Sequence, residues 1–137
     1  MPYDEEDPPY VEPDPDLTKL THEVIGAAIE VHKRLGAGLD ESPYEAALCL
    51  ELRLRQIAFV RQVIVGVEYK GEAIGEKRLD LIVEGKLVVE LKAVEELSPL
   101  HKAQVLTYLK ITGLKSGLLI NFNTIMLKDG IKRIIRS

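Results

Sequence analysis

The stretch RLDLIVEGKLVVELKA, from Arg78 to Ala93, holds two apolar runs separated by a turn that contains a glycine. Leucine and β-branched residues on both sides of such a turn are typical of a β-hairpin. Three charged residues, Asp80, Glu90 and Lys92, lie inside these runs. Charged side chains are depleted in strands unless they face solvent or serve a function, so these three form either a solvated surface or a site.

The register of this hairpin decides whether the three charged side chains can meet. Side chains alternate along a strand, so Glu90 and Lys92 share one face. A two-residue turn pairs Asp80 with Val89 and places Glu90 on the other face. A three-residue loop, residues 84–86, or a bulge pairs Asp80 with Glu90 instead. An odd loop therefore predicts two carboxylates and an ammonium on one patch, which suits a divalent metal and phosphodiester hydrolysis.

Length and composition indicate one folded domain. The chain has 137 residues, of which 46% are apolar and 29% are charged, as in ordinary globular proteins. No apolar run approaches the roughly 20 residues that span a bilayer, and we expect no signal peptide. The single cysteine, Cys49, excludes an internal disulfide and is expected to be a small core residue. These features predict a cytoplasmic protein without a membrane segment.

The charge of the chain is unevenly distributed. Residues 1–16 contain seven acidic residues, five of the seven prolines, and no lysine or arginine. The other residues have 15 acids and 18 bases, so they are positively charged although the whole chain has a net charge of −4. We interpret residues 1–16 as a disordered leader and residues 17–137 as a single domain. The favoured interpretation of the leader is a solubilising extension, and a sharper hypothesis is that it folds back over a basic cleft and competes with nucleic acid.

Apolar periodicity and turn residues predict the order of elements. The expected helices are 17–35, 43–55 and 99–112, and the expected strands are 59–69, 73–83, 87–93, 117–121 and 131–135. The strand at 117–121 follows a helical crossover, so it should lie parallel to its neighbour, and 131–135 should form an edge. This order predicts the α/β (α+β) class, with a central mixed sheet flanked by helices.

Two further segments contain polar residues at suggestive spacing. His101, Gln104 and Tyr108 share one stripe of the helix after Ser98. Gln and Tyr together can position a water or a phosphate oxygen, whereas a surface role for His101 is favoured over metal ligation. Glu41 lies at the start of a helix, where its carboxylate either interacts favourably with the helix dipole or reaches the metal site. The spacing leaves both interpretations open.

A capping box with proline at the first helical position is predicted at residues 42–45. The same region completes a family motif, because Gly38, Glu41 and Tyr44 match the residues that name the GxxExxY protein family. Asp80, Glu90-x-Lys92 and Gln104-xxx-Tyr108 then follow in the order found in PD-(D/E)XK nucleases, to which that family is assigned. The resemblance extends from about Leu17 to the C-terminus.

The resemblance implies a restriction-endonuclease-like core and a role for each matching residue. Asp80 and Glu90, with the backbone carbonyl of Leu91, would hold Mg²⁺ or Mn²⁺. Lys92 would orient the attacking water or stabilise charge on the phosphate. Glu41 would be a further acidic contributor. Gln104, Tyr108 and Tyr44 would position substrate.

The expected function is hydrolysis of DNA, with RNA as an alternative, by a metal-dependent nuclease that binds nucleic acid. Spacing alone favours a different interpretation, in which Glu90 and Lys92 form a surface pair worth about 0–1 kcal/mol beside a solvated Asp80. The family resemblance reverses this preference. The other open alternatives are a non-catalytic nucleic-acid-binding or protein-interaction module on the same fold, and a homo-oligomer formed through an exposed strand edge.

Overall fold

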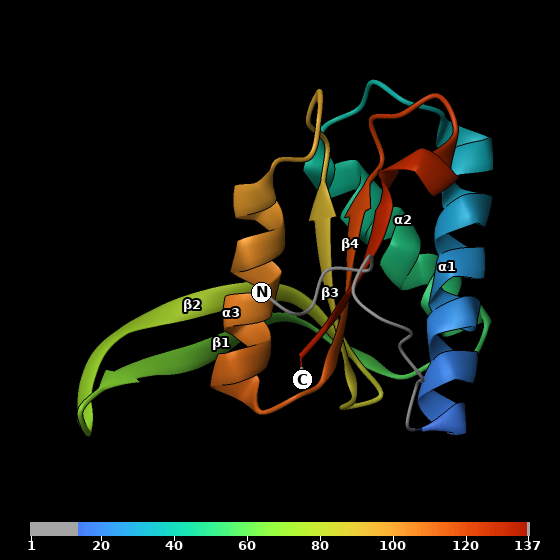
Figure 1. Ribbon diagram of the computed structural model, residues 1–137. Coiled ribbons are helices and arrows are strands. Elements are labelled where there is room, and N and C mark those ends of the chain that lie inside the picture. The colour runs from blue at the N-terminus through green and yellow to red at the C-terminus, as the bar shows by residue number, and fades with distance from the viewer. Residues whose placement is uncertain (1–13, 137) are drawn as a thin grey trace.

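Figure 1 shows the computed structural model, which describes residues 14–136 as three α-helices, a short 3-10 helix and one five-stranded sheet. The elements are α1 (Pro15–Leu35), α2 (Glu41–Leu54), β1 (Phe59–Tyr69), β2 (Glu72–Val83), β3 (Leu87–Lys92), α3 (Pro99–Thr112), β4 (Ser116–Asn121), η1 (Leu127–Gly130) and β5 (Ile131–Ile135). The predicted order of helices and strands is confirmed, with η1 added between β4 and β5.

The sheet is mixed because its connections differ in kind. The strands lie in the order β1-β2-β3-β4-β5, and tight turns join β1, β2 and β3 as antiparallel neighbours. α3 crosses over between β3 and β4, so β4 runs parallel to β3, as predicted. β5 pairs antiparallel with β4 and forms the predicted edge. The expected α+β architecture is confirmed.

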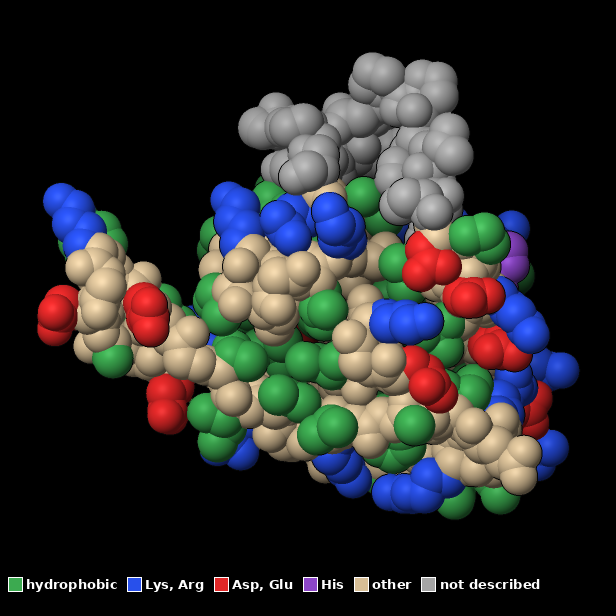
Figure 2. Space-filling view, turned by 90° about the horizontal axis from the view of Figure 1, so that it is seen from below, with side chains coloured by type: hydrophobic (Ala, Val, Ile, Leu, Met, Phe, Trp, Pro, Cys, Tyr) green, Lys and Arg blue, Asp and Glu red, His purple; other side chains and the backbone are tan. Residues whose placement is uncertain are grey.

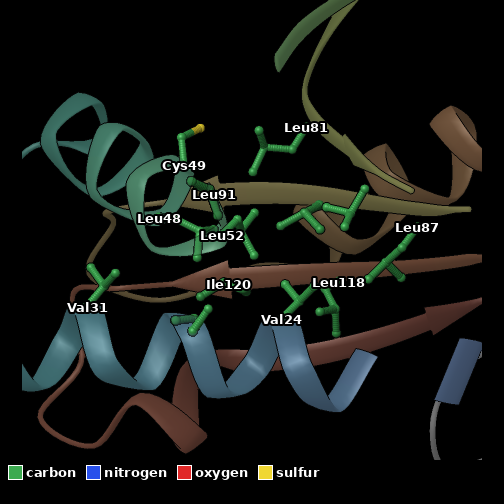
Figure 3. Packing of buried hydrophobic residues seen from close by; sticks show 14 of the residues in the cluster. Val24, Val31, Leu48, Cys49, Leu52, Leu81, Leu87, Leu91, Leu118 and Ile120 are labelled. Carbon is green, nitrogen blue, oxygen red and sulfur yellow. The ribbon is translucent and has the colours of Figure 1, made fainter. Parts of the chain in front are cut away.

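Helices cover both faces of the sheet. α1 and α2 pack on one face, where Val24 and Leu48 of the helices belong to the same core cluster as Leu91 and Ile120 of the strands (Figures 1 and 3). α3 covers the other face, where its Val105 belongs to a second, smaller cluster. Every residue of β4 is buried, as expected for a strand with helices on both faces.

α1 begins at Pro15, two residues earlier than predicted. Asp14 is its N-cap, and the Asp14 carboxylate accepts hydrogen bonds from the N–H groups of Asp16 and Leu17. Residues 15 and 16, which the sequence assigned to the leader, are therefore part of the helix. Residues 1–13 lie outside the described residues.

The capping of α2 and α3 at their N-termini differs from what the sequence predicts. α2 begins at Glu41 after Asp40, so the capping box predicted at Ser42 is wrong. α3 does have a capping box, in which the Ser98 hydroxyl accepts from the His101 N–H and the His101 ring accepts from the Ser98 N–H. A histidine takes the place that glutamate or glutamine usually has in this motif. This explains the position of His101, which the sequence treated as an ordinary surface residue.

β1 and β2 extend beyond the other strands as a two-stranded arm. Their turn, Lys70-Gly71, has φ values of 50° and 84°, which is the geometry of a two-residue type I′ hairpin. β2 is exposed from Glu72 to Arg78 and becomes buried at Leu79. Figures 1 and 2 show the arm standing clear of the body, with acidic and basic side chains along it. The buried inner end of β2 is the part that reaches β3.

Two predictions from composition concern the cysteine and the absence of a membrane segment. Cys49 is fully buried in the larger core cluster, which confirms that it is a small core residue. Within residues 14–136, no helix combines the length and the apolar character needed to cross a membrane.

Candidate active site

The turn between β2 and β3 has the odd length that brings the acidic residues together. Leu81 pairs with Val89, and the register continues to Val83 opposite Leu87. Residues 84–86 therefore form a three-residue loop, and Asp80 lies opposite Glu90. The register with a two-residue turn, which would separate these carboxylates, is excluded.

The backbone hydrogen bonds between β2 and β3 end next to Asp80 and Glu90, and the carboxylates of these two residues then link the strands instead. The last backbone-paired residues are Leu81 and Val89. Beyond them, the Asp80 N–H donates to Oε1 of Glu90 at 2.8 Å, and the Leu91 N–H donates to Oδ2 of Asp80 at 2.8 Å. These two bonds hold the carboxylates face to face and leave one oxygen of each for another partner.

The carbonyl of Leu91 faces the same opening. In an antiparallel pair, the N–H and C=O of one residue point toward the same neighbouring strand. The Leu91 N–H points toward Asp80 on β2, so its carbonyl does the same. This orientation is the one that the predicted metal ligand requires.

Burial makes the two facing carboxyl groups difficult to ionise. It is the largest cause that raises the pKa of Glu90 to about 8, and the charge of Asp80 adds to it. Burial also raises the pKa of Asp80, against the lowering effect of the Leu91 N–H. The protein therefore compensates two negative charges in this position only in part, and a bound cation would supply the rest.

Glu41 and Lys92 complete the cluster from two different elements. Solvent reaches Glu41 at the start of α2, but partial desolvation, followed by the charge of Asp80, raises its pKa. The ammonium of Lys92 lowers the pKa of Glu41, and it acts in the same direction on Asp80 and Glu90. Of the two interpretations that the spacing left open for Glu41, the structure favours proximity to the carboxylates.

α3 adds the predicted Gln104 and Tyr108. Tyr108 is 4% exposed, and burial, followed by the charges of Glu90 and Asp80, raises the pKa of its hydroxyl. A hydrogen bond with the Gln104 side chain acts in the opposite direction. Oε1 of Gln104 is buried and has no hydrogen-bond partner within residues 14–136. An acceptor left in this state is suited to a water or a substrate donor.

The donor set fits a hard divalent cation that keeps part of its water shell. Asp80, Glu90 and the Leu91 carbonyl offer only oxygen atoms, the ligands that Mg²⁺ and Mn²⁺ prefer. No group of three or more His, Cys, Asp or Glu side chains among residues 14–136 has an arrangement that would hold an ion by itself. Mg²⁺ is usually bound through one or two carboxylates and keeps several waters.

Comparison with known proteins identifies the family. A sequence model of the PD-(D/E)XK nuclease superfamily matches residues 18–134. The chain belongs to this superfamily. The crystal structure of SSO0001 has a similar fold, with a TM-score of 0.50, 21% sequence identity and coverage of 70% of this chain. The chain spans about half the length of SSO0001, of which 49% is covered. No curated protein gives a significant match.

Membership in the PD-(D/E)XK superfamily confirms the predicted restriction-endonuclease-like fold. Nucleases of this superfamily generally use divalent metal ions.

The structure does not bring Tyr44 to the carboxylate cluster. The side chain is fully buried and its ring stacks on Phe122, with centroids 4.6 Å apart. Its hydroxyl donates to the Gly36 carbonyl and accepts from the Leu39 N–H. A role of Tyr44 in positioning substrate has no support in this placement, because the side chain holds the loop between α1 and α2.

Sequence reasoning missed three residues beside the PD-(D/E)XK cluster. Glu45 is 7% exposed and lies one helical turn after Glu41. Nε of Arg61 donates to Glu45 at 3.0 Å, and Nε2 of Gln62 donates to both oxygens of Glu45, at 3.0 and 2.9 Å. The four-residue spacing of Glu41 and Glu45 was the available signal, because it places both on one side of α2.

Proposed function

We propose that this protein is a nuclease that hydrolyses phosphodiester bonds of DNA, or alternatively RNA, with Mg²⁺ or Mn²⁺. The proposal depends on one observation above all, the pairing of Asp80 opposite Glu90 with Lys92 on the same strand end. A solvated surface pair would not need two carboxylates that each accept a backbone N–H at the point where the β2–β3 pairing ends. Their low exposure is a cost that a bound ion would offset.

Each residue has a specific task in this proposal. Asp80, Glu90 and the Leu91 carbonyl would hold the ion, which when bound would lower the pKa of a water near the scissile phosphate. The Lys92 ammonium would bind a non-bridging phosphate oxygen and stabilise the negative charge that grows there. Glu41 would accept hydrogen bonds from water at the open side of the cluster, where solvent reaches its carboxylate.

Tyr108 and Gln104 would position the substrate from α3. The Tyr108 hydroxyl, which stays protonated because its pKa is raised, would donate a hydrogen bond to a phosphate oxygen. The unpartnered Oε1 of Gln104 would accept from a sugar hydroxyl, a base or a water. Both contacts would fix the phosphate beside the carboxylates without requiring a particular base sequence.

The finer assignment to the GxxExxY family is part of this proposal. It is supported by the tasks of the three motif residues. Gly38 has φ +104°, a conformation that glycine adopts without strain. Tyr44 fastens the same loop through Gly36 and Leu39, and the loop leads directly to Glu41. The motif would thus set the position of the first carboxylate of α2.

Cleavage assays with the intact chain test the proposal directly. Mg²⁺ or Mn²⁺ should support cutting of at least one substrate among single-stranded, double-stranded and structured nucleic acids. Lys92→Ala should lower the rate by roughly 10²–10³-fold, as expected when one charge-stabilising donor is lost, while Mn²⁺ affinity stays close to wild type. Lys19→Ala, which changes an exposed lysine on α1, serves as the matched control. Absence of cleavage of every substrate with either ion would contradict the proposal.

Two further measurements address the alternatives. A pure binding module need not bind Mn²⁺ at Asp80 and Glu90, so calorimetric titration with Mn²⁺ distinguishes it from a nuclease. A homo-oligomer would use the outer edges of β1 or β5, each of which pairs with only one strand of the described sheet. The mass in solution, measured by light scattering, tests this association.

A further inference from the structure

The backbone of β1 is irregular at the residue that faces Asp80. Arg61 pairs with Leu81 and Val63 pairs with Leu79, so Gln62 lies directly opposite Asp80 although neither is paired in the ladder. Gln62 has φ +54°, a left-handed conformation that is uncommon for a residue with a side chain. Such conformations are energetically costly and persist where surrounding contacts require them.

This conformation aims two neighbouring side chains at one carboxylate. In a regular strand, Arg61 and Gln62 would point to opposite faces. Here both donate to Glu45 of α2, Arg61 at 3.0 Å and Gln62 at 3.0 and 2.9 Å. The left-handed residue therefore turns the Gln62 amide toward α2.

In β2, the side chains on either side of Asp80 lie on opposite faces of the sheet, next to Gln62 of β1. Leu79 belongs to the cluster under α3, whereas Leu81 belongs to the cluster under α1 and α2. Regular alternation would place both on one face. Asp80 thus lies at a twist that β1 and β2 share, and Gln62 is the residue of β1 at that twist.

Gln62 lies between the two acidic residues, because its amide donates to Glu45 and its position in β1 faces Asp80 in β2. Burial raises the pKa of Asp80, whereas hydrogen bonds from the Leu91 N–H and from the Gln62 side chain lower it. A side-chain amide has two N–H groups and can serve two carboxylates at once. Glu45 is itself held by Arg61, so Arg61 and Glu45 fix the amide of Gln62 at the position opposite Asp80.

We propose that Gln62 is a positioning residue, which Glu45 and Arg61 orient so that its amide holds the Asp80 carboxylate in the geometry that binds the divalent ion. The inference rests on the nuclease function proposed above. Partners of this kind fix the direction of a ligand, and losing one typically lowers metal affinity about 10–100-fold.

The variant Gln62→Gly tests the side-chain amide separately from the backbone conformation, because it removes the amide and keeps the conformation. Glycine adopts φ +54° without strain, which offsets part of the loss of the hydrogen bonds to Glu45, so the free energy of unfolding should fall only slightly and the chain should stay folded. Mn²⁺ affinity, measured by calorimetry, should nevertheless fall about 10–100-fold. Gln56→Gly is the matched control, because Gln56 is also left-handed, with φ +61°, but is exposed at the end of α2. It should leave Mn²⁺ affinity unchanged. Wild-type affinity in Gln62→Gly would overturn the proposal.

A measurement on the metal-free chain separates this inference from the proposed function. In nuclear magnetic resonance spectra, the side-chain amide protons of Gln62 should exchange with water more slowly than those of Gln56, and Glu45→Ala should remove the difference. The Asp80 carboxyl ¹³C resonance should move in Gln62→Gly and stay in place in Gln56→Gly. Equal exchange rates at Gln62 and Gln56, or an unmoved Asp80 resonance, would reject the inference whether or not the protein binds Mn²⁺.

Discussion

Glu45 and Glu90 are almost equally buried, with 7% and 4% of their surfaces exposed, but the protein compensates their charges differently. Glu45 receives three hydrogen bonds from Arg61 and Gln62, one of them from a guanidinium. Glu90 accepts one backbone N–H, and no lysine or arginine within residues 14–136 forms an ion pair with it.

The difference indicates which carboxylate serves the fold and which serves a ligand. A buried charge is stable when it is paired and hydrogen-bonded, as at Glu45. Burial and the charge of Asp80 instead raise the pKa of Glu90 to about 8. The protein therefore leaves Glu90 to be compensated by a proton or by an external cation.

The largest expected effect contrasts the two carboxylates in Mn²⁺ binding. Glu90→Gln removes a proposed ligand, so affinity should fall by more than the roughly 10–100-fold that loss of an outer partner costs. Glu45→Gln changes only an outer partner and should stay within that range. Calorimetric titration of both variants measures the difference. Equal losses would remove the distinction between the two residues.

The pH dependence of Mn²⁺ affinity should come from Glu90. A metal ligand must be deprotonated, and the pKa of Glu90 is about 8 in the metal-free chain. Affinity should therefore rise by about tenfold per pH unit up to pH 8 and level off above it. Titrations between pH 6 and 9 would test this. A flat profile below pH 8 would contradict the raised pKa.

Stability of the metal-free chain should fall as the pH rises. The pKa of Glu90 is higher in the folded chain, so between about 4.5 and 8 the folded state holds a proton that the unfolded state has released. The contribution is complete below the unfolded pKa and is lost through pH 8, by on the order of a few kcal/mol. Glu41 and Asp80 shift in the same direction. Urea denaturation across this range should show the slope, and Glu90→Gln should reduce it.

Removing the Arg61 guanidinium should leave Glu45 as poorly compensated as Glu90. Arg61→Met leaves a buried acceptor with only the Gln62 amide, which should lower the free energy of unfolding at pH 7 by about 1–3 kcal/mol. The exposure of Arg61, 41%, favours the lower end. Arg34→Met, which breaks an exposed helical pair with Glu30, should cost about 0.5 kcal/mol or less. Similar losses in both variants would show that burial of Glu45 adds little.

The smallest effect concerns a polar group with no charge. Tyr44→Phe removes the hydroxyl that joins Gly36 and Leu39, so denaturation should show a loss of about 1 kcal/mol. Mn²⁺ affinity and the Michaelis constant for nucleic acid should not change, because Tyr44 is buried away from the cluster. Tyr69→Phe, at an exposed position on the arm, is the control. A raised Michaelis constant in Tyr44→Phe would restore the substrate role that the sequence suggested.

The sequence predicts the fold and the central carboxylates because both depend on local rules. Alternation along strands places Glu90 and Lys92 on one face, and helical spacing places Gln104 near Tyr108. Turn chemistry and apolar runs mark every strand of the sheet. The length of the loop at 84–86 was the one quantity left open, and it decides whether Asp80 meets Glu90.

The rest of the site depends on contacts between distant elements. No local pattern indicates that Gln62 is left-handed, and its amide bonds to Glu45, which lies on another element. The predicted cap at Ser42 failed because the chain enters α2 from Asp40. Tyr44 belongs to a motif of functional residues, but only the tertiary structure shows that its hydroxyl holds a loop.

The three-residue loop between β2 and β3 also restricts how the gene can change. Inserting or deleting one codon there requires either a different kind of turn or a shift of the pairing by one, which would turn Asp80 away from Glu90 because facing residues alternate between the two sides. A length change of two residues would keep the parity. We therefore expect natural length variants of this loop to differ by even numbers, even where the residues within it vary freely.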